Sequence, residues 1–139
     1  MSYSLGVWQA MLASVYVADK VRLGRFEFVP TSRLAEDLGI PAPSLARLLR
    51  DLNRAGIIET REGARGGVRL AVPPDQVTLL AIVDAIEASL PLFRTDSAPR
   101  VTGATPTRRQ AALRRALDSA EQAMRSSLEE VTIDAISQD

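Results

Sequence analysis

Arginine side chains are concentrated between residues 41 and 70, where six of them stand against only three acidic side chains. A guanidinium group binds phosphate oxygens, and it also forms paired hydrogen bonds with the edge of a guanine base. Gly63, Gly66 and Gly67 lie among these arginines, and glycine permits backbone angles and close approaches that other residues do not. Each arginine alone is explained by a solvated surface charge, but their joint placement favours a surface that binds nucleic acid.

The chain around these arginines has the pattern of two short helices followed by a hairpin. Thr31 or Ser32 is expected to cap the first helix, and Gly39 is expected to end it. Pro43 suits the first turn of a second helix, because the N–H that proline lacks is not needed there. The turn-rich segment 62–67, with apolar residues on both sides, predicts two short strands. The predicted buried face of the second helix consists of Leu45, Leu48, Leu49 and Leu52.

This order predicts a mainly α fold with a small β-hairpin wing, that is, a winged helix-turn-helix domain. The second helix is expected to enter the major groove of DNA, with Arg47 on guanine and Arg50 on the backbone. The first N–H groups of both helices are expected to hold phosphates, and the hairpin arginines, Arg69 included, to contact the minor groove or phosphates. The predicted DNA-binding residues are Thr31, Ser32, Pro43, Ser44, Arg47, Arg50, Arg61, Arg65 and Gly66.

Composition argues against an enzyme. The 139 residues include no cysteine and no histidine, so disulfides, thiolate metal sites and the commonest general base are all excluded. We therefore expect no metal site and no cofactor. Asp84 and Glu87 lie one helical turn apart, and a solvated acidic face explains them better than paired carboxylate catalysis. The net charge is zero, with an excess of about three positive charges before residue 75 and of three negative charges after it.

The sequence predicts three regions: a DNA-binding domain over 1–90, a loop over 91–105, and a dimerisation helix with its tail over 106–139. A first helix is expected over 3–22, and Thr78 is expected to cap a short helix that follows two prolines. No apolar run is long enough to span a membrane and no leader is evident, so we expect a soluble protein of the cytoplasm.

A long amphipathic helix is predicted from about Thr105 to Ile133. Its apolar residues are spaced by three and four, which is typical of a helix that packs against another long helix. A symmetric homodimer would cover this stripe, and the alternative is that the helix folds back on its own domain. The predicted dimerisation residues are Leu113, Leu117, Ala120, Met124, Leu128 and Val131.

Three segments resemble the winged-helix regulators of the IscR/NsrR kind, the Rrf-two family. They are LAEDLGI (34–40), LARLLRDLNRAGIIETREG (45–63) and RGGVRLAVPPDQVTLLAIVDAIE (65–87). The resemblance implies a homodimeric transcription factor, usually a repressor, that binds a partly palindromic operator on double-stranded DNA. Many members hold an iron–sulfur cluster through three cysteines in the loop before the long helix.

The chain departs from that family pattern at three places. The loop over 91–107 has no cysteine, so the resemblance implies a regulator that works without a cluster and responds to a small molecule or partner protein. Glu62 occupies the place of a wing arginine, and Pro41 that of a polar residue, so a protein-interaction module without specific DNA binding is the alternative. A ligand pocket is expected near Trp8 and Phe93, although Trp8 also suits a core or a dimer interface.

Overall fold

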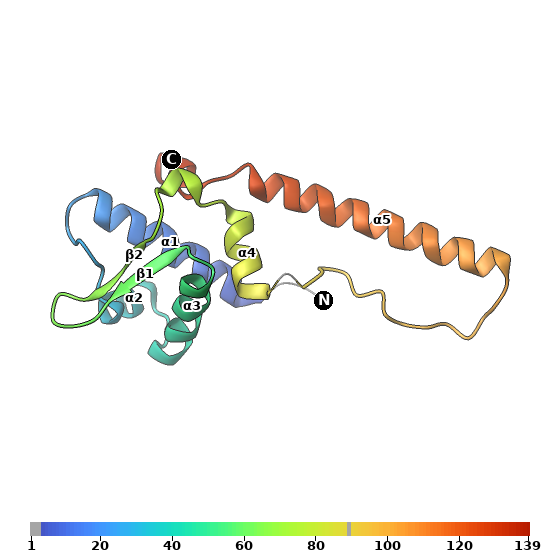
Figure 1. The fold of residues 1–139 in the computed structure, drawn as a ribbon, viewed down its shortest axis with the longest axis horizontal. Coiled ribbons are helices and arrows are strands. Elements are labelled where there is room, and N and C mark those ends of the chain that lie inside the picture. The colour runs from blue at the N-terminus through green and yellow to red at the C-terminus, as the bar shows by residue number, and fades with distance from the viewer. Residues whose placement is uncertain (1–3, 89) are drawn as a thin grey trace.

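The computed structural model describes residues 4–88 and 90–139. Figure 1 shows a body built from the N-terminal helices and a hairpin, from which one long helix projects. The short segment at the C-terminus returns to the body. The elements in order are α1 (Leu5–Arg22), α2 (Thr31–Leu38), α3 (Ala42–Arg54), β1 (Ile58–Arg61), β2 (Gly67–Leu70), the 3-10 turn η1 (Pro74–Gln76), α4 (Leu79–Glu87), α5 (Ala104–Glu129) and α6 (Ile133–Ser137).

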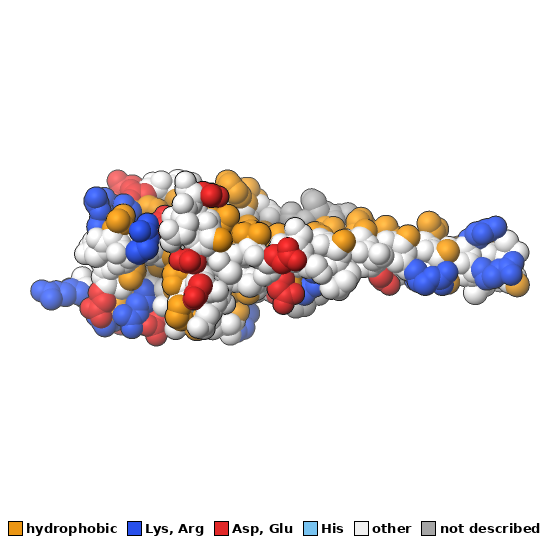
Figure 2. Space-filling model, turned by 90° about the horizontal axis from the view of Figure 1, so that it is seen from above, with side chains coloured by type: hydrophobic (Ala, Val, Ile, Leu, Met, Phe, Trp, Pro, Cys, Tyr) orange, Lys and Arg blue, Asp and Glu red, His pale blue; other side chains and the backbone are white. Residues whose placement is uncertain are grey.

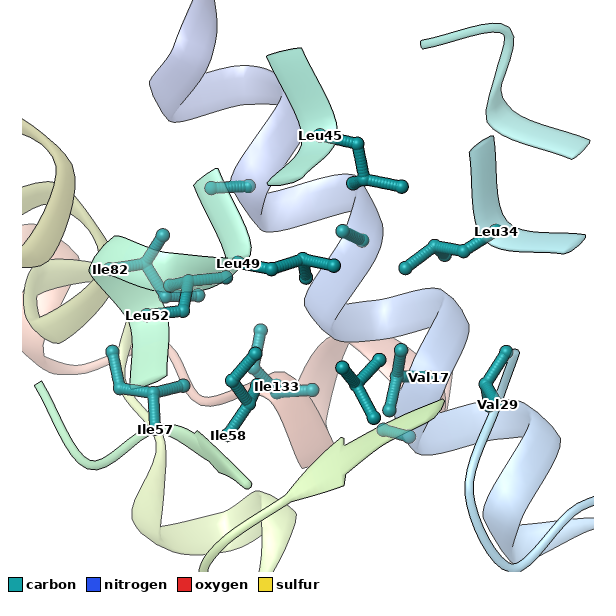
Figure 3. Packing of buried hydrophobic residues seen from close by; sticks show 14 of the residues in the cluster. Val17, Val29, Leu34, Leu45, Leu49, Leu52, Ile57, Ile58, Ile82 and Ile133 are labelled. Atoms are coloured by element: carbon teal, nitrogen blue, oxygen red, sulfur yellow. The ribbon is translucent and has the colours of Figure 1, made fainter. Parts of the chain in front are cut away.

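The core lies between α1, the helix pair α2–α3, the hairpin and α6 (Figure 3). The apolar face predicted for α3 is confirmed, since Leu45, Leu48, Leu49 and Leu52 are all buried. Ile133 of α6 is fully buried in the same cluster, although it lies beyond the long helix in the chain. The C-terminal turn therefore belongs to the core of the N-terminal domain.

The turn between α2 and α3 has the predicted geometry. Gly39 adopts a left-handed conformation with φ 64°, and the N–H of Ile40 donates to the carbonyl of Ala35 at 3.0 Å. The predicted cap of α2 is wrong, because Thr31 and Ser32 lie inside the helix and Pro30 occupies the N-cap position. The side chain of Pro30 accepts no hydrogen bond, so the first N–H groups of α2 lack a side-chain cap.

The hairpin pairs β1 with β2 in antiparallel register, with Ile58 opposite Leu70 and Arg61 opposite Gly67. Val29 adds a further bridge, because its N–H and carbonyl exchange hydrogen bonds of 2.8 and 2.9 Å with Val68. The extended segment before α2 thus forms a third line of backbone beside the wing. A Cβ atom at Gly67 would lie 2.1 Å from the carbonyl oxygen of Val29, so this approach requires glycine.

The long helix ends earlier than predicted. α5 stops at Glu129, and Thr132 starts the separate helix α6, where its side chain accepts from the N–H of Ala135 at 3.1 Å. Thr78 caps α4 in the same way, as predicted, and the two threonines are paired by an antiparallel bridge. Val131 therefore lies in the link, where its carbonyl accepts from Leu79, and not on the stripe of α5.

The stripe of α5 is uncovered within one chain. No residue of α5, all of which is described, is buried, and Leu113 is 66% exposed. Only the C-terminal part of α5 is held by the body, where Arg125 forms two hydrogen bonds of 2.9 and 2.8 Å with Asp84 of α4. Glu87 accepts from the backbone N–H of Ser4, so both of the paired carboxylates have structural partners. Across the described residues, no helix is both long and apolar enough to cross a bilayer.

Candidate nucleic-acid interface

The start of α2, the outer side of α3 and the hairpin surround a common surface, which we call the recognition face. Three hollows lie on it, with volumes of about 450, 320 and 340 Å³. Thr31 lines all three hollows and Ser32 lines two of them. The first hollow lies between α2 and the wing, the second between α2 and α3, and the third between α3 and the hairpin. The fold therefore brings together three segments that the sequence predicted as DNA contacts.

Helix α3 presents its charged side chains to solvent. Arg50 lines one hollow together with Asn53, and Arg47 is exposed one turn closer to the start of the helix. Pro43 and Ser44 lie in the first turn of α3, where Pro43 is exposed and Ser44 is half-buried. Within residues 4–88 and 90–139, neither Arg47 nor Arg50 has a hydrogen-bond or ion-pair partner. Both guanidinium groups are thus available to an anionic partner.

The start of α2 provides a second feature that suits anions. Thr31 and Ser32 are exposed, and the first N–H groups of the helix point out of its end without a side-chain cap. The helix dipole adds a partial positive charge at this place. Phosphate groups bind to helix ends of this kind through backbone N–H groups. Thr31 and Ser32 would meet an anion here with their backbone N–H groups, since neither residue is the cap of the helix.

The three hairpin arginines are in different situations. Arg65 is exposed at the tip of the wing, beside Gly66, and no partner for it exists in the described part of the chain. Arg61 instead donates to Glu27 at 2.9 Å and stacks on the ring of Phe28, with 4.1 Å between guanidinium and ring centroid. Arg69 contacts the same ring at 4.4 Å. Of these three arginines, only Arg65 is therefore free for the predicted contact with the minor groove or with phosphates.

Sequence reasoning missed Glu27 and Phe28. Both residues directly precede Val29, which pairs with Val68 of the wing. The ion pair of Glu27 with Arg61 joins residues 34 positions apart, and no local pattern signals it. Arg61 lowers the pKa of the Glu27 carboxyl, chiefly through their hydrogen bond.

Helix α2 is also tied to α1. The hydroxyl of Tyr16 donates to the carboxylate of Asp37, and Arg33 donates to the same oxygen at 3.1 Å. These bonds lower the pKa of Asp37, with the Tyr16 bond as the largest cause. Burial, followed by this bond, raises the pKa of Tyr16. The hydrogen bond between Tyr16 and Asp37 therefore fixes α2, whose first turn forms part of the recognition face, against α1.

The residues predicted to line a ligand pocket are not brought together. Trp8 is 59% exposed and lines an apolar groove of about 400 Å³ between α1, the end of α2, α4 and α6. Phe93 is not among the residues that line this groove. It lies instead in the segment between α4 and α5, where Leu92 donates its N–H to Glu121 of α5. Within one described chain, Trp8 and Phe93 therefore do not form one pocket.

Comparison with known proteins agrees with this geometry. A family model described as Rrf2, iron-dependent transcriptional regulator, matches residues 9–139. A curated protein of Synechocystis sp. that is named as an HTH-type transcriptional regulator is 48% identical over 60 residues, which are 43% of this chain and 41% of that protein. IscR of Cereibacter sphaeroides is 31% identical over 86 residues, which are 62% of this chain and 55% of that protein. The chain thus spans about half the length of these curated relatives.

Solved structures share the fold. A transcriptional regulator structure from Listeria innocua aligns with a TM-score of 0.76 at 21% identity, covering 98% of this chain and 85% of that one. IscR of T. potens aligns with a TM-score of 0.73 at 18% identity, covering 100% of this chain and 88% of that one. CymR, the global cysteine regulator of B. subtilis, aligns with a TM-score of 0.70 at 18% identity, covering 99% and 97%. At these identities the alignments establish the winged-helix fold.

The iron dependence in the family's description does not fit the residues of this chain. The sequence has neither cysteine nor histidine, which are the usual ligands of protein-bound iron and iron–sulfur clusters. The carboxylates of the described residues do not compensate, because no three of them gather into a group that could hold a metal ion. The match over 9–139 covers nearly the whole chain, and the family's members are regulators and not enzymes. The chain belongs to the Rrf2 family of winged-helix transcriptional regulators.

Proposed function

We propose that this protein is a homodimeric repressor of the cytoplasm that binds a partly palindromic operator on double-stranded DNA without an iron–sulfur cluster. The observation that carries this proposal is the recognition face. It carries the exposed, unpaired side chains of Arg47, Arg50 and Arg65. It also carries the uncapped start of α2, where Thr31 lines all three hollows and Arg50 lines one of them. Backbone N–H groups and unpaired guanidinium groups on one surface are what phosphates and guanine edges require.

In this proposal α3 enters the major groove at its N-terminal end. Arg47 forms a bidentate contact with guanine, and Arg50 contacts the phosphate backbone. Pro43 and Ser44 lie at the base edges, while Thr31 and Ser32 hold a phosphate at the start of α2. Arg65 and Gly66 place the wing tip at the minor groove. The carboxylate of Glu62, beside the tip, repels phosphates. We therefore expect the operator preference of this protein to differ from that of relatives that carry an arginine at this position.

A second copy of the chain covers the stripe of α5. Figure 2 shows hydrophobic side chains in a row along the projecting helix, basic groups at its far end and acidic groups nearer the body. The first half of α5 carries Arg108, Arg109, Arg114 and Arg115. The second half carries Asp118, Glu121 and Glu129 together with Arg125, whose charge is compensated by Asp84 of α4. In an antiparallel pair these halves face one another with opposite charge. The proposed interface residues are Leu113, Leu117, Ala120, Met124 and Leu128.

The signal in this proposal is a small molecule. The apolar groove beside Trp8 supports it, because that groove touches the last residue of α2, Leu38, as well as α4 and α6. A ligand in the groove would contact both the helix pair of the recognition face and the elements that anchor α5. A ligand that binds one arrangement of these helices better than another shifts the equilibrium toward it.

The proposal is tested by fluorescence-anisotropy titration of the purified protein against DNA from upstream of its own gene. A scrambled duplex of equal length is the control, and both are measured at low and moderate salt without added metal. We expect selective binding whose affinity falls with salt by about one log–log unit per phosphate neutralised. Equal binding to both duplexes at both salt concentrations would favour the protein-interaction module instead.

A further inference from the structure

Two arginines of the hairpin are held against the segment that precedes α2. Arg61 and Arg69 belong to β1 and β2, and both guanidinium groups lie against the ring of Phe28, at 4.1 and 4.4 Å from its centroid. Phe28 is only 6% exposed and directly precedes Val29, which pairs with the wing. An arginine stacked on a buried ring in this way is fixed in orientation.

Carboxylates on both sides of these arginines compensate their charge. Glu27 contacts Arg61 at 2.9 Å and Arg69 at 3.6 Å, and Glu59 contacts Arg69 at 2.5 Å. Two positive and two negative charges thus alternate in one chain of contacts. Its net charge is zero, so it adds little to the field that attracts DNA. We call these five residues, Glu27, Phe28, Glu59, Arg61 and Arg69, the wing brace.

The wing brace connects two parts of the recognition face, the wing and the segment that leads into α2. Glu27 and Phe28 stand three and two residues before Pro30, the N-cap of α2, and the opposite end of the brace lies on the hairpin. The hollow of about 450 Å³ between α2 and the wing is lined by Thr31 and Ser32 on one side and by Arg61, Glu62 and Gly66 on the other. Of the brace residues, Arg61 lines this hollow, and its contacts with Glu27 and Phe28 tie the wing side of the hollow to the segment that leads into α2.

Resting on the proposed DNA-binding function, we propose that Arg61 is a positioning residue that, with Glu27, holds the wing at a fixed distance from the start of α2 and does not contact DNA. Arg65 then makes the wing's electrostatic contact. This assignment separates two arginines that lie four residues apart on the same hairpin. It also predicts that removing either end loosens the wing and that the two effects do not add, because both changes remove the Glu27–Arg61 contact.

The test uses the full chain with four variants: Glu27→Gln, Arg61→Gln, both together, and Arg65→Gln as the matched control. Hydrogen–deuterium exchange of the hairpin is the first readout and needs no DNA. We expect the protection of the Val68 N–H, which donates to Val29, to fall in both single variants. The double variant should lose less than the sum of the two single losses, because both remove the same contact, and Arg65→Gln should leave the protection unchanged. Unchanged protection in both single variants would refute the brace.

The salt dependence of operator binding is the second readout. Arg61→Gln and Glu27→Gln should each weaken binding roughly two- to fivefold at every salt concentration, with an unchanged slope of log affinity against log salt. Arg65→Gln should instead reduce that slope by about 0.9, the value for one lost phosphate contact. A reduced slope in Arg61→Gln would make Arg61 a DNA contact, and tighter binding by Glu27→Gln would make Glu27 a competitor of the phosphates; either result overturns the proposal.

The two readouts separate failure of this inference from failure of the proposed function. A wild-type protein that binds no DNA, with hairpin protection lost in both single variants, would refute the repressor and retain the brace as a structural device. Selective operator binding together with unchanged protection in both variants would retain the repressor and refute the brace.

Discussion

At the scale of the residue, the arginines of the proposed interface differ in whether a carboxylate of the protein already binds their guanidinium group. Arg47 and Arg50 on α3 have no partner in the described chain, whereas Arg61 and Arg69 are paired with carboxylates. An unpaired, exposed arginine keeps its full charge and all five donors for a ligand. A paired arginine must first lose its protein contacts. The proposed contacts of the recognition face therefore rest on Arg47, Arg50 and Arg65.

Arg47→Ala should remove the discrimination between the operator and a scrambled duplex. A bidentate contact with guanine is worth about 1–3 kcal/mol of discrimination, so the ratio of the two affinities should fall by a factor between about 5 and about 150. Anisotropy titrations of both duplexes at one salt concentration measure this ratio. Arg100→Ala, an exposed arginine far along the chain in the segment before α5, is the control and should leave the ratio unchanged. An unchanged ratio in Arg47→Ala would remove Arg47 from the base contacts.

The fate of the predicted residues shows what sequence can reveal at this scale. Gly39, Pro43 and the four leucines of α3 were predicted because their roles depend on neighbours within one or two helical turns. Thr31 was assigned as a cap because threonine favours that position, but Pro30 supplies the extended conformation one residue earlier. The partner of Arg61 was missed because Glu27 is 34 residues away, and only the assembled fold brings the two together.

At the scale of the element, the wing depends on its close approach to the segment before α2. Gly67→Ala should destabilise the hairpin, because its Cβ would lie 2.1 Å from a backbone oxygen and its φ of 147° is strained for any side chain. The backbone strain alone costs about 1–3 kcal/mol. Gly63→Ala is the matched control, since its φ of 98° is also positive but no atom lies within 4 Å of the added Cβ. Chemical unfolding should show a larger loss for Gly67→Ala; equal losses would contradict the role of the contact.

The tie between α1 and α2 should make stability depend on pH. The pKa of Asp37 is lowered in the folded protein from its ordinary value of 3.8, chiefly by the Tyr16 hydroxyl. In the window just below that value the unfolded chain therefore binds more protons, and stability falls as the pH falls through it. Tyr16→Phe should flatten this dependence in urea unfolding between pH 5 and about 3. In an Asp37→Asn background, Tyr16→Phe should not change the pH dependence of stability any further. A steeper pH dependence in Tyr16→Phe alone would contradict the assignment.

Helix ends were the least predictable feature of the elements. The apolar spacing of α5 continues through Val131, and the sequence therefore predicted one helix as far as Ile133. The structure ends it at Glu129 because Val131 and Ile133 form backbone hydrogen bonds of 2.9 Å with Leu79 and Val77. Thr132 followed by Ala135 repeats the cap of Thr78 with Ala81, and this local signal was available in the sequence.

At the scale of the whole molecule, α5 is an arm without a partner. Its 26 residues extend about 39 Å at 1.5 Å per residue, and the body holds only its C-terminal part. An apolar stripe along such an arm is unfavourable in water unless a second molecule covers it. The opposite charges of the two halves of α5 favour a copy that runs in the antiparallel direction. In the proposed dimer, two recognition faces joined in this way match the two half-sites of a palindromic operator.

Leu113→Asp combined with Leu117→Asp should convert the protein into a monomer. Leu113 is 66% exposed in a single chain, so its replacement leaves the fold of the protomer intact and acts only on the interface. The control is Ser119→Asp with Ser126→Asp, which adds the same charge at exposed positions off the stripe. In sedimentation the wild type and this control should have twice the 15.0 kDa mass of one chain, and the stripe variant that mass alone. The monomer should also bind the operator more weakly, because one chain occupies one half-site. A wild type that sediments as a single chain would refute the dimer.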